Sequence, residues 1–351
     1  MHDRQIKTYV HVNLSRGYRG GERQTLLLIQ CMANQLTSRQ ICLVCHPDGE
    51  LARRAMQLEH VLCVFARSQL MAHRLVSRLK PSLVHAHEAR AVHWAFIQWV
   101  VYRVPYVITR RISQAPKNNW FTKLCYRKAT HVVAISGAIA ESLRVFGVDV
   151  SAIIKSVGPI RSAPCKTSWK RVDPFVFKIL CAAALCDDQK GQSVLIGAME
   201  MLPDDVHVTF LGDGPDKAFL EAQASKTNQS GQIEFRPWFD EVGDLFKSHD
   251  LFVLPSRHEG LGSILVDAMQ LGLPIVSTNV GGIPDLIKDG ETGLLAEGSD
   301  VESLAHQIKR MYRSECLRSE VATRAVQSVV NLTPDTMCAH YLKIYQSVDV
   351  D

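Results

Sequence analysis

Short runs of β-branched and other apolar residues alternate along the chain with longer segments whose apolar residues recur at helical spacing. This alternation is typical of repeated strand–helix units, which build a parallel sheet covered by helices. In the first half, the predicted strands are residues 8–14, 40–46, 61–66, 83–86, 106–109 and 131–135. Helices are predicted between them, for example at residues 22–35 and 137–146, and Ser136 is placed to cap the second of these.

A second series begins after a polar stretch, residues 161–172, which contains Pro164 and is typical of an interdomain linker. Its predicted strands are residues 176–183, 206–212, 233–237, 251–254 and 274–277. Helices are predicted to dominate from Asp300 onward, and a last helix is predicted to follow Thr333, because Pro334 suits a first helical position. We therefore expect an α/β protein with two parallel-sheet domains, residues 1–165 and 166–332, and one ligand site in the cleft that they face. A C-terminal helix, residues 333–351, is expected to pack back on the first domain.

Composition indicates a soluble globular protein, since 46% of the 351 residues are apolar and 21% are charged. Asp3, Arg4 and Lys7 interrupt the start of the chain, so no signal peptide is indicated. The longest apolar stretch, residues 91–102, is too short to span a membrane, and a cytoplasmic location is expected. Of the ten cysteines only Cys42 and Cys45 form a CxxC pair. That pair lies in a predicted strand, where positions three apart face opposite sides, so buried free thiols are expected.

The net charge of +5 conceals a split between the two halves of the chain. Residues 1–165 carry 23 Lys and Arg against 8 Asp and Glu, and residues 166–351 carry 17 against 27. An anionic partner is therefore expected for the first half: a membrane surface, a phosphorylated acceptor or nucleic acid. Residues 102–128 interleave basic with aromatic side chains, which suits the anionic inner face of a membrane. The alternative is a solvated basic face whose aromatics lie in the core, and nucleic acid is not expected because no recognition motif is present.

The segment 254–269 carries the strongest indication of chemistry. Glu259 lies on a glycine-flanked turn, and Asp267 follows eight positions later in an otherwise apolar helix. That helix should be buried, and a buried carboxylate must be hydrogen-bonded or neutralised. A ligand with paired hydroxyls, such as a ribose, would satisfy Asp267. Gly260, Leu261, Gly262 and Ser263 form a tight loop that opens the helix, so its backbone N–H groups and positive dipole end would face anionic or sugar oxygens.

Several motifs in order resemble the C-terminal domain of family 4 glycosyltransferases, which are retaining enzymes of the GT-B fold with two Rossmann-like domains. The matching segments are residues 187–191 (Asp-Asp-Gln-Lys-Gly), 210–215 (Phe-Leu-Gly-Asp-Gly-Pro), 259–267, 281–285 (Gly-Gly-Ile-Pro-Asp) and 289–295 (Asp-Gly-Glu-Thr-Gly-Leu-Leu). The first domain matches more loosely at residues 19–22 (Arg-Gly-Gly-Glu), 85–88 (His-Ala-His-Glu) and 133–136 (Val-Ala-Ile-Ser). The resemblance therefore spans nearly the whole chain.

The resemblance implies a role for each motif. It places Glu259 on hydroxyls of the donor sugar, Asp267 on the ribose and Lys190 on the diphosphate, where a cation stabilises the leaving group. Donor contacts are also expected from the glycine-flanked loop and from Gly212 and Gly214. Simpler structural roles stay open: Lys190 as a solvated turn residue, Glu259 as a helix cap, and the two glycines as turn residues after a strand. Residues 281 and 282 are expected to let a loop pass close to the cleft.

In the first domain, Gly20 and Gly21 lie between a strand and a helix, where open α/β sheets bind ligands. The loop lacks a full G-x-G-x-x-G motif, so an NAD site is not expected. The resemblance places this loop beside donor phosphate and acceptor, and His87 near the reacting sugar carbon. His85, one strand period away, is the weaker candidate, and a structural role for either histidine remains the alternative.

Two departures from the family pattern stand out. Asp267 replaces the usual Glu, which shortens the side chain by about 1.5 Å, one carbon–carbon bond. The Arg that assists the diphosphate five or six residues before the Lys is replaced by Ala184 and Leu185. Replacement candidates are Arg257, Arg236 and Arg19, and one of these three is expected to point into the cleft.

The function expected from the resemblance is retaining transfer of a sugar from a nucleotide-diphosphate donor to a glycan or glycolipid. Lipopolysaccharide or another envelope polysaccharide is the acceptor class expected from the family. No metal and no other cofactor is expected, since a Lys and a helix terminus supply the positive charge at the diphosphate. Two alternatives are a nucleotide-sugar epimerase or hydrolase of the same fold, and a weakly binding scaffolding homologue.

Overall fold

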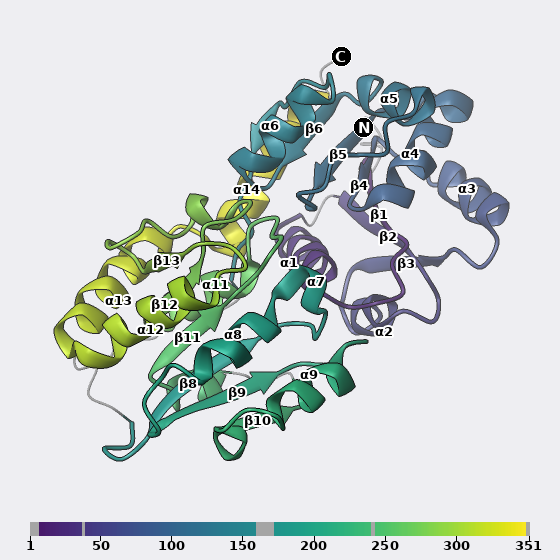
Figure 1. Ribbon diagram of the computed structural model, residues 1–351. Helices are drawn as coiled ribbons and strands as arrows, with labels where there is room; N and C mark the ends of the chain where they lie inside the picture. The colour runs from purple at the N-terminus through teal and green to yellow at the C-terminus, as the bar shows by residue number, and fades with distance from the viewer. Residues whose placement is uncertain (1–6, 37–38, 159–171, 240–242, 349–351) are drawn as a thin grey trace. The chain divides into compact units, whose positions relative to one another are not determined.

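The computed structural model describes residues 7–36, 39–158, 172–239 and 243–348 (Figure 1). Residues group into two compact units: residues 1–157 together with 334–351, and residues 158–333. The predicted boundary at residue 165 lies outside the described residues. So does the predicted linker, residues 161–172, except for Val172.

The first unit contains a parallel sheet with the strand order β3-β2-β1-β4-β5-β6-β7. Its strands are β1 (Lys7–Asn13), β2 (Arg39–Cys45), β3 (Val61–Phe65), β4 (Leu83–Ala86), β5 (Tyr106–Arg110), β6 (His131–Ala134) and β7 (Ala152–Ile153). The six predicted strands are confirmed, each end within one residue. The short β7 was not predicted. Cys42 and Cys45 are buried free thiols in β2, as expected, and burial raises the pKa of each to about 12.

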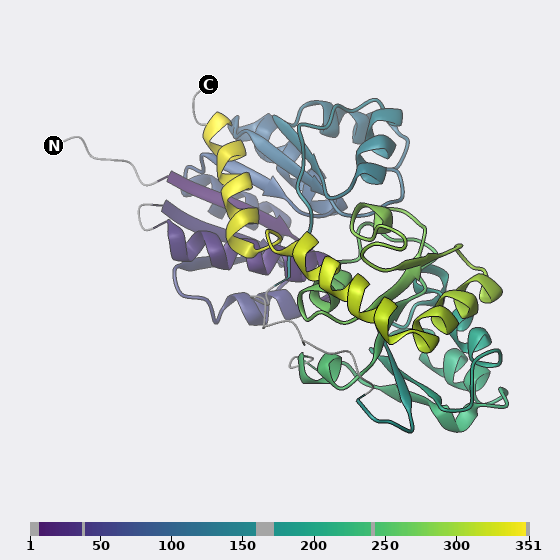
Figure 2. The same cartoon turned by 90° about the vertical axis from the view of Figure 1, so that its left-hand side faces the viewer.

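The helices of the first unit are α1 (Gly20–Gln35), α2 (Glu50–Ala55), α3 (Gln69–Arg78), α4 (Ala89–Tyr102), α5 (Trp120–Arg127), α6 (Gly137–Val145) and α14 (Pro334–Val348). The Ser136 hydroxyl caps α6 by accepting from the Ile139 N–H. Helix α14 lies against β1 and α1, as Figure 2 shows. Its Tyr345 ring packs edge-on against Tyr9, with centroids 4.9 Å apart.

The second unit contains a parallel sheet with the strand order β10-β9-β8-β11-β12-β13. Its strands are β8 (Phe177–Ala182), β9 (Val206–Leu211), β10 (Ile233–Arg236), β11 (Leu251–Leu254), β12 (Ile275–Thr278) and β13 (Leu294–Ala296). Its α-helices are α7 (Asp187–Lys190), α8 (Gln192–Met199), α9 (Lys217–Ala224), α10 (Gly243–Lys247), α11 (Ser263–Gln270), α12 (Val301–Arg313) and α13 (Glu315–Val329). Five strands were predicted within one residue, and β13 was missed. The apolar stripe predicted after Asp300 is the buried face of α12: Leu304, Ala305, Ile308 and Met311.

Both sheets share one feature that positions a site. The strand order reverses between β1 and β4 in the first unit, and between β8 and β11 in the second. In open α/β sheets, ligands bind outside the carboxyl ends of the strands at this reversal. Ligand-binding residues are therefore expected in the loops after β1 and β4, and in those after β8 and β11.

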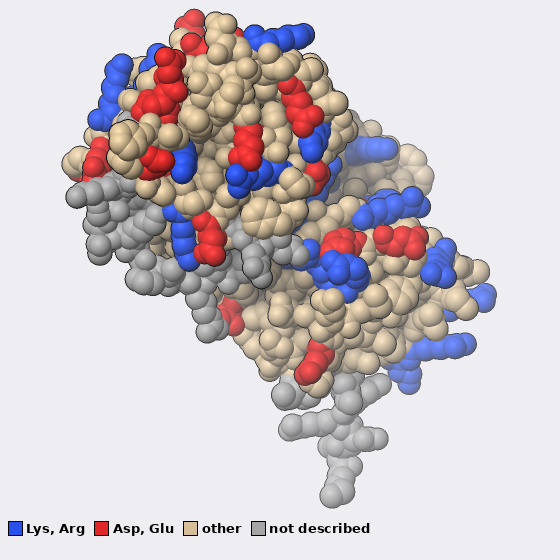
Figure 3. All heavy atoms as spheres, turned by 90° about the horizontal axis from the view of Figure 1, so that it is seen from below, with Lys and Arg blue, Asp and Glu red and all other residues tan. Residues whose placement is uncertain are grey.

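Two further observations concern the charges on the surface and the length of the helices. Both basic and acidic side chains are present on the face seen in Figure 3. Among the described residues, no helix is long and apolar enough to cross a membrane.

Candidate active site

Lys190 and Glu259 meet at the reversal point of the second sheet. Lys190 ends α7, which follows β8, and Glu259 lies in the loop between β11 and α11. The Lys190 Nζ is 2.5 Å from the Glu259 Oε2, and the two side chains are 20% and 13% exposed. The Ser256 hydroxyl donates to the same oxygen at 3.3 Å, and the Gly260 N–H donates to Oε1 at 3.2 Å. Lys190 and Glu259, which the sequence predicted as separate donor contacts, thus form a partly buried ion pair that the surrounding loop orients.

The two loops that carry this pair are joined through their backbones. The Gln189 carbonyl accepts from the N–H groups of Arg257 and His258 at 2.9 and 3.1 Å. Gly191 has a φ of +62°, and a Cβ there would lie 2.3 Å from the Pro255 carbonyl oxygen. Only glycine allows this approach, so the Lys-Gly sequence fixes Lys190 against the loop of Glu259.

Gly281 fixes Glu259 from its other side. Its φ is +55°, and a Cβ there would lie 2.0 Å from the Glu259 carbonyl oxygen. The Gly282 N–H donates to that same carbonyl at 3.2 Å. Glycine is therefore required at position 281 by the close approach of one backbone to another.

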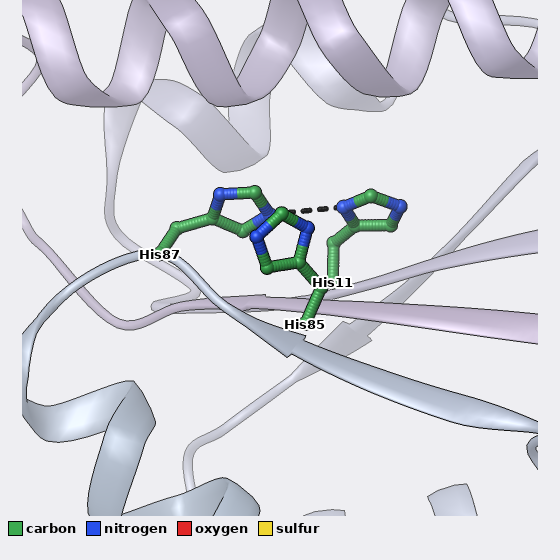
Figure 4. Close-up of side chains that lie close together, drawn as sticks. All are labelled: His11, His85 and His87. Carbon is green, nitrogen blue, oxygen red and sulfur yellow. Dashed lines mark hydrogen bonds between the residues drawn. The ribbon is translucent and has the colours of Figure 1, made fainter. Parts of the chain in front are cut away.

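Three histidines gather at the reversal point of the first sheet (Figure 4). His11 on β1 is in register with His85 on β4, and His87 follows β4 by one residue. The His11 Nδ1 is 2.9 Å from the His87 Nε2, and the rings of His85 and His87 have centroids 3.9 Å apart. All three are buried, with exposures of 0, 0 and 3% for His11, His85 and His87.

Hydroxyl groups and one guanidinium complete this cluster. The His85 Nδ1 is 2.5 Å from the Tyr345 hydroxyl, and its Nε2 is 2.7 Å from the Thr109 hydroxyl. Arg111 donates from one terminal nitrogen to the His87 Nδ1 at 3.0 Å and to its carbonyl at 3.3 Å. Burial, helped by the Arg111 charge, lowers the pKa of His11 to about 3. Burial also holds the pKa values of His85 and His87 well below the ordinary value, so the three rings are neutral at neutral pH.

The histidine cluster is the one group in the described part of the chain that meets a simple distance criterion for a metal site, with ligand atoms within 4.8 Å of one another. Its chemistry does not fit a cation. Both nitrogens of His85 are already hydrogen-bonded, and a guanidinium lies directly on His87. We assign no metal to it and derive no step through one.

Comparison with known proteins identifies both units. A family model described as "Glycosyl transferases group 1" matches residues 176–328, and one described as "Glycosyltransferase Family 4" matches residues 18–154. The chain belongs to the family 4 glycosyltransferases.

Two curated relatives of this family 4 chain are named as biosynthetic glycosyltransferases. A lipopolysaccharide core biosynthesis glycosyltransferase, LpsE of Rhizobium meliloti, is 31% identical over 46% of this chain and 47% of its own length. A putative teichuronic acid biosynthesis glycosyltransferase, TuaC of Bacillus subtilis, is 26% identical over 72% and 66%. The match thus covers about half the length of LpsE. Among solved structures, Anabaena Alr3699/HepE in complex with UDP and glucose has a TM-score of 0.84 at 19% identity, covering 97% of this chain and 100% of that one. This likeness confirms the two-sheet GT-B fold.

The other predicted donor residues of the family 4 site divide into two groups. Gly262 has a φ of +82° and precedes α11, and the loop residues Gly260 and Leu261 are buried. Gly212 and Gly214 have a packing role. A Cβ on Gly212 would lie 2.0 Å from the Ala183 carbonyl oxygen, and a Cβ on Gly214 would lie 2.2 Å from the Leu185 carbonyl oxygen. Close packing of the loop after β9 on the loop after β8 is therefore sufficient to explain these two glycines.

Asp267 is buried, as expected, with 1% of its surface exposed on α11. A Cβ added to Gly158 would lie 2.9 Å from the Asp267 Oδ1 and 2.2 Å from the Gln270 amide oxygen. The carboxylate therefore packs beside the Gly158 backbone. Its contact with a ribose stays a proposal.

The three arginines considered as replacements for the family Arg differ in position. Arg257 donates to the Ser193 hydroxyl at 3.0 Å and lies 3.5 Å from the Asp187 carboxylate, so it is held on the turn that carries Lys190. Arg236 pairs with Glu234 at 2.8 Å and is 46% exposed, and Arg19 is exposed. Arg257 thus lies beside the predicted diphosphate residue, Lys190.

Sequence reasoning missed His11, Tyr345 and Arg111 as site residues. His11 lies in a correctly predicted strand, but its proximity to His85 depends on the pairing of β1 with β4. Arg111 was counted only as one member of the basic segment. No local pattern marks either residue.

Replacing Gly281 by Ala is expected to destabilise the second unit and to displace Glu259. The added methyl cannot be accommodated without moving the Glu259 backbone, and the positive φ adds roughly 1 kcal/mol of strain. Gly290→Ala is the matched control, because its φ is +72° and a Cβ there meets nothing within 4 Å. We expect urea unfolding to show a clearly larger loss for Gly281→Ala. Equal losses in the two variants would contradict the proposed role of Gly281.

Proposed function

We propose that this protein transfers a sugar from a nucleotide-diphosphate donor to a glycan or glycolipid acceptor, with retention of the anomeric configuration. The observation that carries the proposal is the Lys190–Glu259 pair, 2.5 Å apart, at the strand-order reversal of the second sheet. Family membership and the position of the pair support the same reaction class. The donor is the only small molecule required, and no metal or other cofactor enters the proposal.

Each group at the pair has a distinct task in this reaction. The Lys190 ammonium has three N–H donors, so it can bind diphosphate oxygens while keeping its bond to Glu259. The N-terminus of α11, opened by Gly262, adds a positive dipole end. Both stabilise the charge that develops on the leaving nucleoside diphosphate. Glu259, held by Ser256 and Gly260, presents carboxylate oxygens to hydroxyls of the donor sugar, and Asp267 is proposed for the ribose.

The proposed step uses no protein nucleophile. The acceptor hydroxyl oxygen forms a bond to the anomeric carbon on the face from which the diphosphate oxygen departs. The bond from that carbon to the diphosphate breaks, and a donor phosphate oxygen takes the hydroxyl proton. Retention follows because attack and departure share one face.

An envelope glycan is the acceptor class that we propose. The names of LpsE and TuaC assign those relatives to lipopolysaccharide core and teichuronic acid biosynthesis. Both are glycans of the cell envelope, which supports an acceptor of that kind here.

A panel of nucleotide sugars, each with and without glycolipid acceptors, tests the function. We expect release of nucleoside diphosphate that depends on acceptor, and a product whose anomeric configuration, read by NMR, matches the donor. An inverted product would overturn the retaining mechanism. Donor turnover without acceptor would favour an epimerase or hydrolase, and failure to bind any nucleotide diphosphate in calorimetry would favour a scaffolding homologue.

An anionic lipid surface is the second partner that we propose, and only the exposed residues of the basic segment could contact it. Of the predicted interfacial segment, residues 102–128, Tyr106 and Tyr126 are buried in the core, as the alternative interpretation had it. Trp120, Val101 and Tyr102 are 75%, 58% and 39% exposed. We call the exposed part, Val101, Tyr102, Arg103, Trp120, Phe121 and Lys128, the α4–α5 surface. It pairs apolar side chains with cations, as binding to lipid headgroups requires.

Sedimentation with lipid vesicles tests the α4–α5 surface. The protein is expected to bind phosphatidylglycerol vesicles at low salt, and Trp120→Ala to weaken binding several-fold, because the indole is the most exposed apolar group there. Phe219→Ala on α9 is the control, since Phe219 is also half exposed. Retention by phosphatidylcholine vesicles to the same extent, or no retention at low salt, would exclude the anionic surface as a partner.

A further inference from the structure

Arg111 is a cation of the first unit that nothing in the proposed mechanism uses. It follows β5 directly, beside the reversal point of the first sheet, and its side chain is only partly exposed. We propose that Arg111, held in position by His87, binds a phosphate group of a substrate. This inference rests on the proposed function and adds a phosphate-binding residue to it.

Charge is the first argument. Within the described residues, Arg111 makes no ion pair with a carboxylate, and its Nε is buried without a hydrogen-bond partner. The nearest titratable rings, those of the histidine cluster, are neutral and offer no counter-charge. Glu22 is near enough to favour the charged guanidinium, but its carboxylate oxygens already accept from the Arg19 N–H at 3.0 Å and the Asn13 amide at 3.5 Å. A partly buried cation without an anionic partner is costly, and an anionic ligand would remove that cost.

Geometry is the second argument. One terminal nitrogen of Arg111 is bonded to His87, and the edge formed by Nε and the other terminal nitrogen has no partner in the described part of the chain. Two parallel N–H donors on such an edge match two oxygens of a phosphate. The Arg111 Cδ lies 3.7 Å from where a Cβ on Gly21 would be, so the side chain runs over the N-terminus of the 16-residue helix α1. The unpaired N–H groups at this helix N-terminus carry partial positive charge and would face the same phosphate.

Proton positions in the cluster are the third argument. Arg111 can only donate, so the His87 Nδ1 must accept, and the single proton of the neutral ring must be on Nε2. That proton is donated to the His11 Nδ1, which places the His11 proton on a buried Nε2 without a partner. Both nitrogens of His87 are thereby engaged inside the protein, and none remains to act on a sugar. His87 is therefore a positioning residue for Arg111.

Two sources of phosphate fit this chemistry: the diphosphate of the donor, and a phosphate carried by the acceptor. The full-length protein with Arg111→Gln distinguishes them, with Arg111→Lys as the conservative variant and Arg144→Gln, on the exposed side of α6, as the matched control. Calorimetry with UDP and with uridine measures donor-side binding. The KM values for donor and acceptor are measured in parallel.

For the donor diphosphate, Arg111→Gln is expected to weaken UDP binding about 10- to 100-fold, the size of one charge-assisted contact, and to leave uridine binding unchanged. For an acceptor phosphate, the same factor would appear in the acceptor KM while UDP binding stays constant. Arg111→Lys should recover part of either loss. If wild-type protein binds UDP and Arg111→Gln changes none of these quantities, the inference is wrong while the proposed function stands. If wild-type protein binds and turns over no nucleotide sugar, both fail.

A double variant tests the role of His87. If His87 acts through Arg111, adding His87→Phe to Arg111→Gln should cause no further loss, because the two residues form one unit. If the loss in the double variant equals the product of the two single losses, His87 acts independently of Arg111, and its positioning role is wrong. His87→Gln, which keeps a hydrogen-bonding group, should retain more UDP affinity than His87→Phe. Equal losses of UDP affinity in the two variants would also contradict the positioning role of His87.

Discussion

Glu259→Gln is expected to lower the turnover number about 100- to 1,000-fold, the usual effect of removing one well-placed electrostatic contact to a transition state. The amide keeps the shape of the side chain but loses the charge that pairs with Lys190 and the second acceptor oxygen that the donor hydroxyls require. Steady-state kinetics with the best donor of the panel measures the effect.

The control for Glu259 is Glu302→Gln, on the exposed first turn of α12, which should leave turnover unchanged. A Glu259→Gln protein that turns over at the wild-type rate would show that Glu259 serves only as a loop cap. That outcome would remove the main support for the donor site in the second unit.

Lys190→Met is expected to lower turnover by a similar factor, about 100-fold or more, because no other described cation contacts Glu259. Methionine keeps much of the length of the side chain and removes its charge. The loss should appear mainly in the turnover number, since charge on the leaving diphosphate is greatest in the transition state. Lys226→Met, on an exposed turn after α9, is the control and should behave as wild type.

The double variant Lys190→Met with Glu259→Gln tests whether the pair acts as one unit. Its loss should be much smaller than the product of the two single losses, because each single change leaves the partner without its contact. Fully multiplying losses would mean that Lys190 and Glu259 act independently, which contradicts a shared site.

Much of the fold follows from local sequence pattern. Strand β11 is a short, continuous apolar run, and β4 is apolar except for His85; both were predicted residue for residue. β7 and β13, of two and three residues, carry too little pattern to be distinguished from loops. The strand orders, and with them the two reversal points, are set by long-range pairing that no local pattern encodes.

The candidate site was predictable only in part, for the same reason. Glu259 and Lys190 lie in motifs that the family resemblance could assign, and adjacent strands then bring them together. Which backbone groups the glycines at 212, 214 and 281 approach could not be predicted, because the carbonyl groups concerned lie elsewhere in the chain. Tyr345, more than 200 residues from His85 and Thr109, reaches the histidine cluster only because α14 packs on the first unit.

The basic segment shows how composition misleads when burial is unknown. Tyr106 and Tyr126 were counted with exposed aromatics, yet the first is buried on β5 and the second on the buried face of α5. Arg111, which the same count treated as surface charge, contacts the histidine cluster instead. A strand-end cation next to buried rings has no signature that separates it from a solvated one.

A crystal structure of the protein with its preferred nucleotide sugar is the most direct test of the account. We predict that the diphosphate lies at the carboxyl ends of β8 and β11 with its oxygens on the Lys190 ammonium, and that the sugar hydroxyls contact the Glu259 carboxylate. A ligand bound with its diphosphate away from Lys190, and its sugar out of reach of Glu259, would contradict it.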